Sequence, residues 1–177
     1  MTGLTAGVVP GPGVPRFELS PHNCFACGTL NSHGLRLLLH VEPGRSWSEV
    51  TLDKRFEGWA GIAHGGILCT ILDEVMAWAL VGGDNWGLTT RLSVQFRKPV
   101  EVGRPFLAEG WVTRSRRRLV ETASRLVDGA SGAELATAEG VYFAADEARK
   151  KELRESYGFR LVGEAPVDTP DSVDLAR

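Results

Sequence analysis

The chain has 177 residues, of which 43% are hydrophobic and 24% are charged. This composition is ordinary for a globular protein and supplies enough apolar material for a core without metal or disulfide staples. The 20 basic and 22 acidic residues give a net charge of −2, so no overall positive field favours nucleic acid as a partner.

The cysteine count and the N-terminus both bear on location. Three cysteines are too few, and odd in number, for a disulfide framework, which favours the cytoplasm. Residues 1–20 contain no basic stretch and no apolar run, so they are not typical of a secretory signal. No run of about 18 apolar residues is evident, so no membrane-spanning segment is expected. We therefore expect a soluble cytoplasmic protein without a membrane partner.

The pattern along the chain predicts one domain with an extra segment at each end. Residues 1–20 are rich in glycine and proline and are predicted to form a flexible arm. Residues 21–145 hold the strand and long-helix signals and form the predicted domain. Residues 146–177 begin with charged helix formers and are predicted to form a short solvated helix and a tail.

The first predicted elements of the domain are two strands, at Leu35–Val41 and Trp47–Leu52. A long helix is predicted over Gly65–Val81, because this segment contains no proline and is followed by the stop signal Gly82-Gly83. Four strands follow, the last two as a hairpin: Leu88–Arg97, Pro105–Thr113, Arg118–Asp128 and Ala133–Ala144.

This order of two strands, one long helix and four strands in an antiparallel meander predicts an α+β fold. We expect an antiparallel sheet of about five to six strands wrapped around one long central helix. Strands and helices do not alternate, so a doubly wound parallel sheet is not expected.

The long helix has one apolar face and one small, polar face. At about 100° per residue, the apolar face toward the sheet holds Ile67, Leu68, Ile71, Leu72, Val75 and Ala79. Gly66, Thr70, Asp73 and Ala77 gather on another face. A carboxylate among small residues is typical of close approach by another backbone, and a second subunit is the expected neighbour.

His64-Gly65-Gly66 lies where this helix begins. The first N–H groups of a helix have no internal partner and carry partial positive charge, and glycines let a ligand approach the backbone. Such a site can bind a carbonyl oxygen and stabilise the negative charge that develops when the carbonyl is attacked. Asp73 is a candidate general base or nucleophile. The neighbouring Glu74 projects toward a different face and is the weaker candidate.

The spacing of these groups predicts a homodimer. Asp73 follows Gly66 by seven residues, which is on the order of 10 Å along the helix axis. That distance is too long for Asp73 to reach a carbonyl held at the start of its own helix. A second, antiparallel copy of the helix would bring its Asp73 to the Gly66 of the first, giving two equivalent composite sites.

Three stretches together resemble PaaI-like acyl-CoA thioesterases of the hotdog superfamily. The first runs from His64-Gly65-Gly66 to Asp73 at the spacing of that group. The second is the Cys-Gly and Gly-Leu entry, residues 23–28 with 34–35. The third is the strand Thr89–Pro99, which fits the pattern T-x-x-L-x-V-x-F-x-x-P. The resemblance covers about residues 22–145 and implies a hotdog fold.

The resemblance also implies roles for the matching residues. Gly66, with Gly65, would polarise the thioester carbonyl, and Asp73 of the other subunit would activate water or attack directly. Thr89 matches a position that helps to orient the water. His64 is expected to orient or cap the helix rather than act as a base. Hotdog dimers often pair further into tetramers. Residues 58–63 depart from some relatives, because they contain no Asn or Gln to bind the water.

Two further groups of residues have alternative interpretations. Cys24-x-x-Cys27, with His22 and His33 nearby, has the residue types of a zinc site. The His33 spacing is unusual and no second CxxC exists, so we expect no metal, and redox chemistry is less expected still. The dense basic run Arg114, Arg116, Arg117 and Arg118 is either a solvated hairpin turn or a site for the phosphates of CoA. Arg97 and Lys98 are lesser candidates for that contact.

No GxSxG elbow, Walker loop, GxGxxG fingerprint or HExxH helix is present in the sequence. The expected function is therefore hydrolysis of an acyl-CoA to a free acid and CoA, with no cofactor other than the CoA of the substrate. A non-catalytic acyl-CoA-binding hotdog protein and a hotdog enoyl-CoA hydratase or dehydratase are the alternatives.

Overall fold

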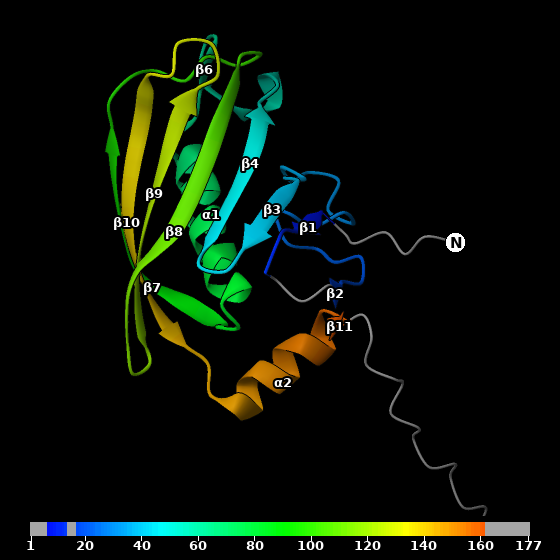
Figure 1. The fold of residues 1–177 in the computed structure, drawn as a ribbon. Coiled ribbons are helices and arrows are strands. Elements are labelled where there is room, and N and C mark those ends of the chain that lie inside the picture. Colours follow the sequence, from blue (N-terminus) through cyan, green and yellow to red (C-terminus); the bar gives the residue numbers. More distant parts are fainter. Residues whose placement is uncertain (1–6, 14–16, 162–177) are drawn as a thin grey trace, which may run out of the picture.

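The computed structural model describes residues 7–13 and 17–161 and shows a curved sheet that wraps around one long helix (Figure 1). The elements in chain order are β1 (Val8–Pro10), β2 (Phe17–Glu18), β3 (Leu39–Glu42), β4 (Arg45–Thr51), the 3-10 helix η1 (Lys54–Phe56), β5 (Glu57–Trp59), β6 (Ile62–Ala63), α1 (Gly65–Gly82), β7 (Gly87–Phe96), β8 (Pro105–Arg116), β9 (Leu119–Asp128), β10 (Glu134–Ala144), α2 (Glu147–Ser156) and β11 (Arg160–Leu161). The predicted α+β class is confirmed, although the main sheet has seven strands where five to six were expected.

The central helix α1 is closed at both ends and covered along one side. The His64 side chain caps its first turn, and the Gly83 N–H donates to the Leu80 carbonyl at its last turn. Contrary to the expectation from sequence, α1 is long and apolar enough to cross a membrane by length and composition alone. Half of that segment is buried inside the protein, because the sheet wraps around it. A core helix of a folded domain accounts for this composition.

The main sheet has the strand order β1-β3-β4-β8-β9-β10-β7. β8, β9 and β10 form an antiparallel meander, as predicted. The prediction is wrong for β7, which pairs with β10 instead of β8, while β8 pairs with β4. Alternation of polar and apolar residues identifies a strand and its faces but does not identify its neighbour. As a result β7 is an edge strand, and its outer side has no strand partner in the part of the chain that the structure describes.

Part of the segment that was expected to be a flexible arm is built into the fold. β1 pairs in parallel with β3, and Val8 is fully buried. β2 pairs with β11, and Phe17 stacks on Phe159 with ring centroids 4.6 Å apart. The arm prediction is wrong for these residues, because composition does not reveal apolar partners that lie far along the chain. Its remaining residues, 1–6 and 14–16, lie outside the described residues.

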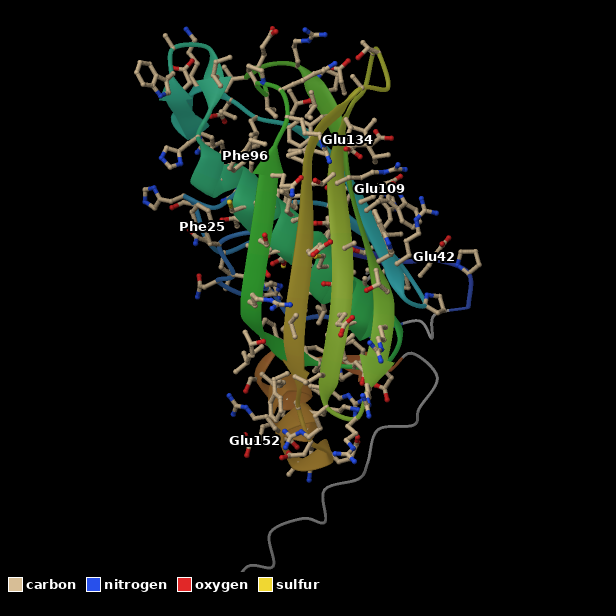
Figure 2. All side chains as sticks on the ribbon, turned by 90° about the vertical axis from the view of Figure 1, so that its left-hand side faces the viewer. Phe25, Glu42, Phe96, Glu109, Glu134 and Glu152 are labelled. Carbon is tan, nitrogen blue, oxygen red and sulfur yellow. The ribbon has the colours of Figure 1, made fainter. Side chains whose placement is uncertain are left out.

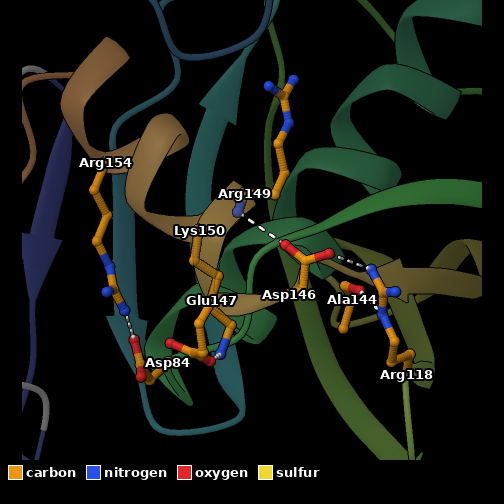
Figure 3. Close-up of polar contacts among 8 residues, drawn as sticks. All are labelled: Asp84, Arg118, Ala144, Asp146, Glu147, Arg149, Lys150 and Arg154. Atoms are coloured by element: carbon orange, nitrogen blue, oxygen red, sulfur yellow. Dashed lines mark hydrogen bonds and ion pairs between the residues drawn. The ribbon is translucent and has the colours of Figure 1, made fainter.

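The predicted C-terminal helix is present as α2, and ion pairs join it to neighbouring segments (Figure 3). Asp146 caps its first turn and pairs with Arg118 at 3.6 Å. Arg154 pairs with Asp84, which lies between α1 and β7. These contacts fix α2 at the end of the sheet where α1 finishes (Figure 1). The predicted tail beyond residue 161 lies outside the described residues.

The backbone of α1 touches the sheet at Gly110 of β8. A Cβ atom at Gly110 would lie 2.5 Å from the carbonyl carbon and oxygen of Val75, so only glycine fits there. The Ser46 hydroxyl of β4 donates to the same Val75 carbonyl at 2.5 Å. This contact sets the depth of the helix against the sheet, and with it the position of Asp73, which lies two residues earlier.

Candidate active site

The turn that starts α1 leaves one backbone donor free. The Gly66 N–H donates to His64 Nδ1 at 2.9 Å, and the N–H groups of Ile67 and Leu68 donate to the His64 carbonyl. The Gly65 N–H has no hydrogen-bond acceptor within residues 7–13 and 17–161. The donor that remains for a ligand is therefore Gly65. The sequence placed Gly66 first, because sequence alone does not show that the His64 ring occupies the Gly66 donor. Which of the two N–H groups binds the carbonyl stays a prediction.

His64 acts as a structural cap at this turn. Because its Nδ1 accepts a hydrogen bond from a backbone N–H, a neutral His64 ring carries its proton on Nε2. The backbone of His64 is extended, with φ −67° and ψ 133°, as the residue before a helix requires. The geometry fits the orienting and capping role that was expected.

Phe96, at the end of β7, borders the free Gly65 donor. The nearest atom to a Cβ placed on Gly65 would be Phe96 Cζ, at 3.4 Å. Phe96 is 53% exposed, and Figure 2 shows it at the end of β7 beside the start of α1. An apolar group attached to a carbonyl at Gly65 would therefore meet an aromatic ring.

Asp73 of α1 is held through one of its two carboxylate oxygens. Oδ1 accepts hydrogen bonds from the Thr89 hydroxyl at 2.9 Å and from the Tyr142 hydroxyl at 2.6 Å. Oδ2 has no hydrogen-bond partner among the described residues. The structure thus brings together Asp73 and Thr89, two of the predicted site residues. It also leaves one oriented carboxylate oxygen able to accept a proton or attack a carbonyl carbon.

Tyr142 is the site residue that sequence reasoning missed. It belongs to β10, is 1% exposed, and its hydroxyl also contacts the Asp73 carbonyl oxygen at 2.9 Å. Burial, followed by the nearby Asp73 charge, raises the pKa of the Tyr142 phenol above its ordinary value. The available signal was strand alternation, which puts Tyr142 on the same face as Ala138 and Gly140. A lone hydroxyl on a face of small residues requires a polar partner.

The arginine cluster spans the turn from β8 to β9, at the end of the sheet near α2, whereas α1 begins at the opposite end, next to β6 (Figure 1). Arg118 donates to the Ala144 carbonyl at 2.9 Å, pairs with Asp146 (Figure 3) and lies over a phenylalanine ring. Arg114 is 4.0 Å from Glu121. Arg116 and Arg117 form no ion pair within the described part of the chain. Of the four predicted residues, these last two are open to a ligand.

The two lesser candidates for CoA contact lie near the other end of the sheet. Arg97 pairs with Glu134 at 2.8 Å. Lys98 lines a pocket of about 280 Å³ between the β7–β8 connection and the β9–β10 hairpin. Neither Asp73 nor Gly65 lines this pocket, so it is separate from the site built on α1.

A second polar cluster lies where the loop at residues 24–28 meets α1. One ligand atom each from Cys24, Cys27 and Glu74 lies within 4.8 Å of the others. Glu74 Oε1 is 3.8 Å from Cys24 Sγ and accepts a hydrogen bond from Trp78 Nε1 at 3.0 Å. The Cys27 thiol first, and then backbone N–H groups, lower the pKa of Cys24 to about 5. Burial raises the pKa of Glu74 to about 7.

This cluster differs from the set of metal ligands considered from sequence, which was Cys24, Cys27, His22 and His33. His33 is exposed on a turn, and His22 Nδ1 accepts a hydrogen bond from the Cys24 N–H at 3.3 Å. Glu74 takes the place of the histidines. Sequence reasoning assigned Glu74 only as a weaker alternative to Asp73, because no spacing rule connects a helix residue to a loop so far upstream.

Comparison with known proteins indicates the class of protein to which this chain is similar. A family model described as thioesterase superfamily matches residues 60–133, which include both the HGG turn and Asp73. The structure of protein RHA08564, a thioesterase superfamily protein, is 26% identical with a TM-score of 0.62, and the match covers 67% of this chain and 62% of that chain. The chain therefore spans less than two thirds of that relative. No curated protein matches the sequence.

Two other solved structures support the same fold. The smu.793 protein of Streptococcus mutans UA159, bound to acetyl CoA, is 19% identical with a TM-score of 0.57 over 59% of this chain and 84% of that chain. The E. coli PaaI protein from the phenylacetic acid degradation operon is 17% identical with a TM-score of 0.55 over 58% and 77%. The class defined by fold and site is thus a hotdog-fold protein, as predicted. Within that class, the predicted resemblance to PaaI-like thioesterases is confirmed.

Proposed function

We propose that this protein hydrolyses an acyl-CoA thioester to a carboxylic acid and CoA, in the cytoplasm, at composite sites across a homodimer. The observation that carries the proposal is the Asp73 carboxylate, whose Oδ1 is held by Thr89 and Tyr142 while Oδ2 has no partner among the described residues. The family match of the segment that contains Asp73 supports thioester chemistry. The acetyl CoA bound to the similar Streptococcus mutans protein supports a CoA-linked substrate.

The separation of the two half-sites along one helix supports a dimer. Asp73 lies eight residues after Gly65, which is about 12 Å at about 1.5 Å per residue. One carbonyl cannot contact both. A second copy of α1, running antiparallel, would place its Asp73 beside the free Gly65 N–H of the first.

The edge strand β7 offers a surface for such a dimer. This ten-residue strand pairs through nine of its residues with β10 and with no other strand in the described part of the chain, and an exposed edge of this length invites pairing with another strand. Leu88, at one end of it, is 71% exposed. Phe25 and Phe96, both exposed, lie on the side of the molecule where β7 is the edge (Figure 2). Antiparallel pairing of two β7 strands would bury this apolar surface and align the two copies of α1. From the family resemblance, we also propose that two dimers pair to form a tetramer.

The chemistry then follows from the two half-sites. The Gly65 N–H of one subunit polarises the thioester carbonyl and stabilises its oxygen as negative charge develops. Asp73 of the partner subunit accepts a proton from a water molecule that attacks the carbonyl carbon, or attacks that carbon itself. When water attacks, the carbon–sulfur bond breaks, the proton taken up by Asp73 passes to the sulfur, which leaves as the CoA thiol, and the acyl group leaves as a carboxylic acid. When Asp73 attacks, the carbon–sulfur bond breaks as a mixed anhydride forms. A water molecule then hydrolyses the anhydride, which releases the acid and restores Asp73, and the proton set free goes to the CoA thiolate. Thr89 holds Asp73 Oδ1. We assign Arg116 and Arg117, which form no ion pair in the described part of the chain, to binding the CoA phosphates.

The proposal is tested by measuring thiol release from a panel of acyl-CoA substrates, with wild-type protein and with Asp73→Asn. The substitution preserves the size of the side chain but removes its basicity, so turnover should fall by about 10²–10⁴-fold. Circular dichroism and the native mass show whether the variant is folded and assembled. Near wild-type hydrolysis by Asp73→Asn would rule out the assigned role.

Two other outcomes of the same panel would replace the proposal. Binding of acyl-CoA by the wild-type protein without thiol release from any substrate would identify a non-catalytic acyl-CoA-binding protein. Hydration of a 2-enoyl-CoA faster than hydrolysis of any thioester would identify a hydratase.

A further inference from the structure

The loop from Cys24 to Gly28 has the form of a metal-binding turn. The Gly28 N–H donates to the Cys24 carbonyl at 2.9 Å. A Cβ atom on Gly28 would lie 2.5 Å from the backbone N and O of Cys24, so the turn closes tightly only because glycine follows the second cysteine. The result is two sulfur ligands presented close together by one rigid loop.

Glu74 of α1 completes a three-residue cluster with this loop. Its Oε1 is oriented by the Trp78 indole at 3.0 Å, and its Oε2 lies 4.0 Å from Cys24 Sγ. Cys27 is 2% exposed, and the other two residues are half-buried. No Lys or Arg forms an ion pair with Glu74 among the described residues. Three groups that repel one another when ionised thus share a small volume, and only protons or a bound cation can neutralise them.

We propose that Cys24, Cys27 and Glu74 bind a zinc ion that joins the N-terminal loop to the central helix one residue from Asp73. Thiolate ligands favour zinc over magnesium and calcium. Zinc takes sulfur at about 2.3 Å and carboxylate oxygen at about 2.0–2.2 Å, so ligand atoms within 4.8 Å of one another need only a small contraction to surround it. His22 has no ring nitrogen in the group of ligand atoms that lie within 4.8 Å of one another, so the fourth position of a tetrahedral ion falls to water.

The role of this ion is positional. It cross-links a loop near residue 25 to a helix residue near 74, and so restricts the unfolded chain in the manner of a disulfide. It also fixes the turn of α1 that carries Asp73. The ion takes no part in the two hydrogen bonds that hold the Asp73 carboxylate. Zinc binding is independent of whether the protein hydrolyses thioesters.

The test uses the full chain, purified under reducing conditions, loaded with zinc and separated from excess metal by gel filtration. Elemental analysis should give about one zinc ion per chain for the wild type. Cys24→Ser, Cys27→Ser and Glu74→Gln should each lower this ratio, while Cys69→Ser, a matched cysteine on α1, should retain it. Asp73→Asn should also retain zinc, which separates a failure of this inference from a failure of the proposed function.

Cobalt substitution provides a second readout that does not depend on activity. Co²⁺ in the site should show thiolate-to-metal charge-transfer absorption and the visible bands of a tetrahedral ion, and Glu74→Gln should alter them. Because Cys27 is buried, the Cys27→Ser result counts only if circular dichroism shows a native fold. If that variant does not fold, the Glu74→Gln result decides the test. A folded wild-type protein that holds no zinc and shows no charge-transfer band would overturn the inference. A Cys24–Cys27 disulfide in freshly purified protein without metal would overturn it too, as would unchanged zinc affinity in Glu74→Gln.

Discussion

The Tyr142 hydroxyl lies 2.6 Å from Asp73 Oδ1 and 2.9 Å from the Asp73 carbonyl oxygen. One buried group from β10 therefore meets both the side chain and the backbone of a single residue of α1. Because burial raises the pKa of the phenol, Tyr142 remains a hydrogen-bond donor throughout the physiological pH range. Together with Thr89 of β7 it holds Oδ1 and so restricts the rotamer of Asp73.

Replacement of this hydroxyl should reduce turnover without unfolding the protein. Tyr142→Phe keeps the ring in its place but removes a hydrogen bond to a charged group, which is worth about 1.5–3 kcal/mol. We expect kcat to fall by about tenfold, corresponding to about 1.4 kcal/mol, with KM little changed. Steady-state thiol release measures both. Tyr157→Phe is the matched control, because Tyr157 is the other tyrosine and does not contact Asp73. Equal kcat values for the two variants would contradict a positioning role for Tyr142.

Thr89 should act through its hydroxyl rather than its shape. Thr89→Val is nearly isosteric and removes the donor 2.9 Å from Asp73 Oδ1, whereas Thr89→Ser keeps that donor. Because Thr89 is exposed, water partly replaces the lost bond, and the expected fall in kcat is smaller, about three- to tenfold. Thr89→Ser should restore most of the rate. If valine and serine behave alike, the hydroxyl has no part in holding Asp73.

Gly65 offers a way to delete one N–H group without disturbing the helix. Proline is well tolerated at the first position of a helix, and the extended backbone of His64 is the conformation that proline requires before it. Gly65→Pro should therefore remain folded but lose about 10²–10³-fold in kcat, as for removal of one oxyanion-hole donor. Gly65→Ala keeps the N–H, and its Cβ would meet Phe96 at an ordinary 3.4 Å. The kcat ratio of the two variants measures the N–H alone, and a ratio near one would exclude the Gly65 donor.

The contact between α1 and β8 should dominate local stability. In Gly110→Ala the new methyl group would lie 2.5 Å from the Val75 backbone, so the helix must shift, at a cost of about 1–3 kcal/mol. Thermal denaturation should show Tm lower by about 2–4 °C for each kcal/mol. Gly83→Ala is the control, because the nearest atom to its Cβ would be 3.5 Å away. A Tm for Gly110→Ala equal to that of the control would mean that the sheet accommodates the methyl group.

Local patterns in the sequence predicted much of the fold and part of the site. The helix expected over Gly65–Val81 is observed over Gly65–Gly82, because a long segment without proline that is followed by two glycines is a local signal. Asp73 and Thr89 were both selected, and they lie in contact. The meander β8-β9-β10 also followed from local turns and alternation.

The features that sequence reasoning missed depend on contacts between distant segments. Tyr142 reaches Asp73 across 69 residues, and Glu74 reaches Cys24 across 50. The neighbour of β7 is set by how the chain crosses the sheet, which no local pattern records. The choice of Gly65 over Gly66 depends on the orientation of one imidazole ring, because only the ring position shows which N–H it occupies.

Mixing two inactive variants should restore activity if each site takes one half from each subunit. Gly65→Pro lacks the donor, and Asp73→Asn lacks the carboxylate. In a mixed dimer, one site combines both defects, and the other combines the intact Gly65 of one chain with the intact Asp73 of its partner. Random pairing makes about half of the dimers mixed, so co-expression should recover about a quarter of wild-type kcat.

The control for this experiment is the double variant Gly65→Pro with Asp73→Asn, co-expressed with wild type. Every site in those mixed dimers contains one defect, so mixing should lower activity instead of restoring it. Mixed dimers of one Gly65→Pro chain and one Asp73→Asn chain, isolated through two different affinity tags, should show about half of wild-type kcat per dimer. Activity in the Gly65→Pro and Asp73→Asn mixture that stays at the mean of the two parents would place both groups of a site in one chain, or in no shared site at all. The spacing of eight residues along α1 would then have to be bridged by a bend of the helix, which its continuous span from Gly65 to Gly82 does not provide.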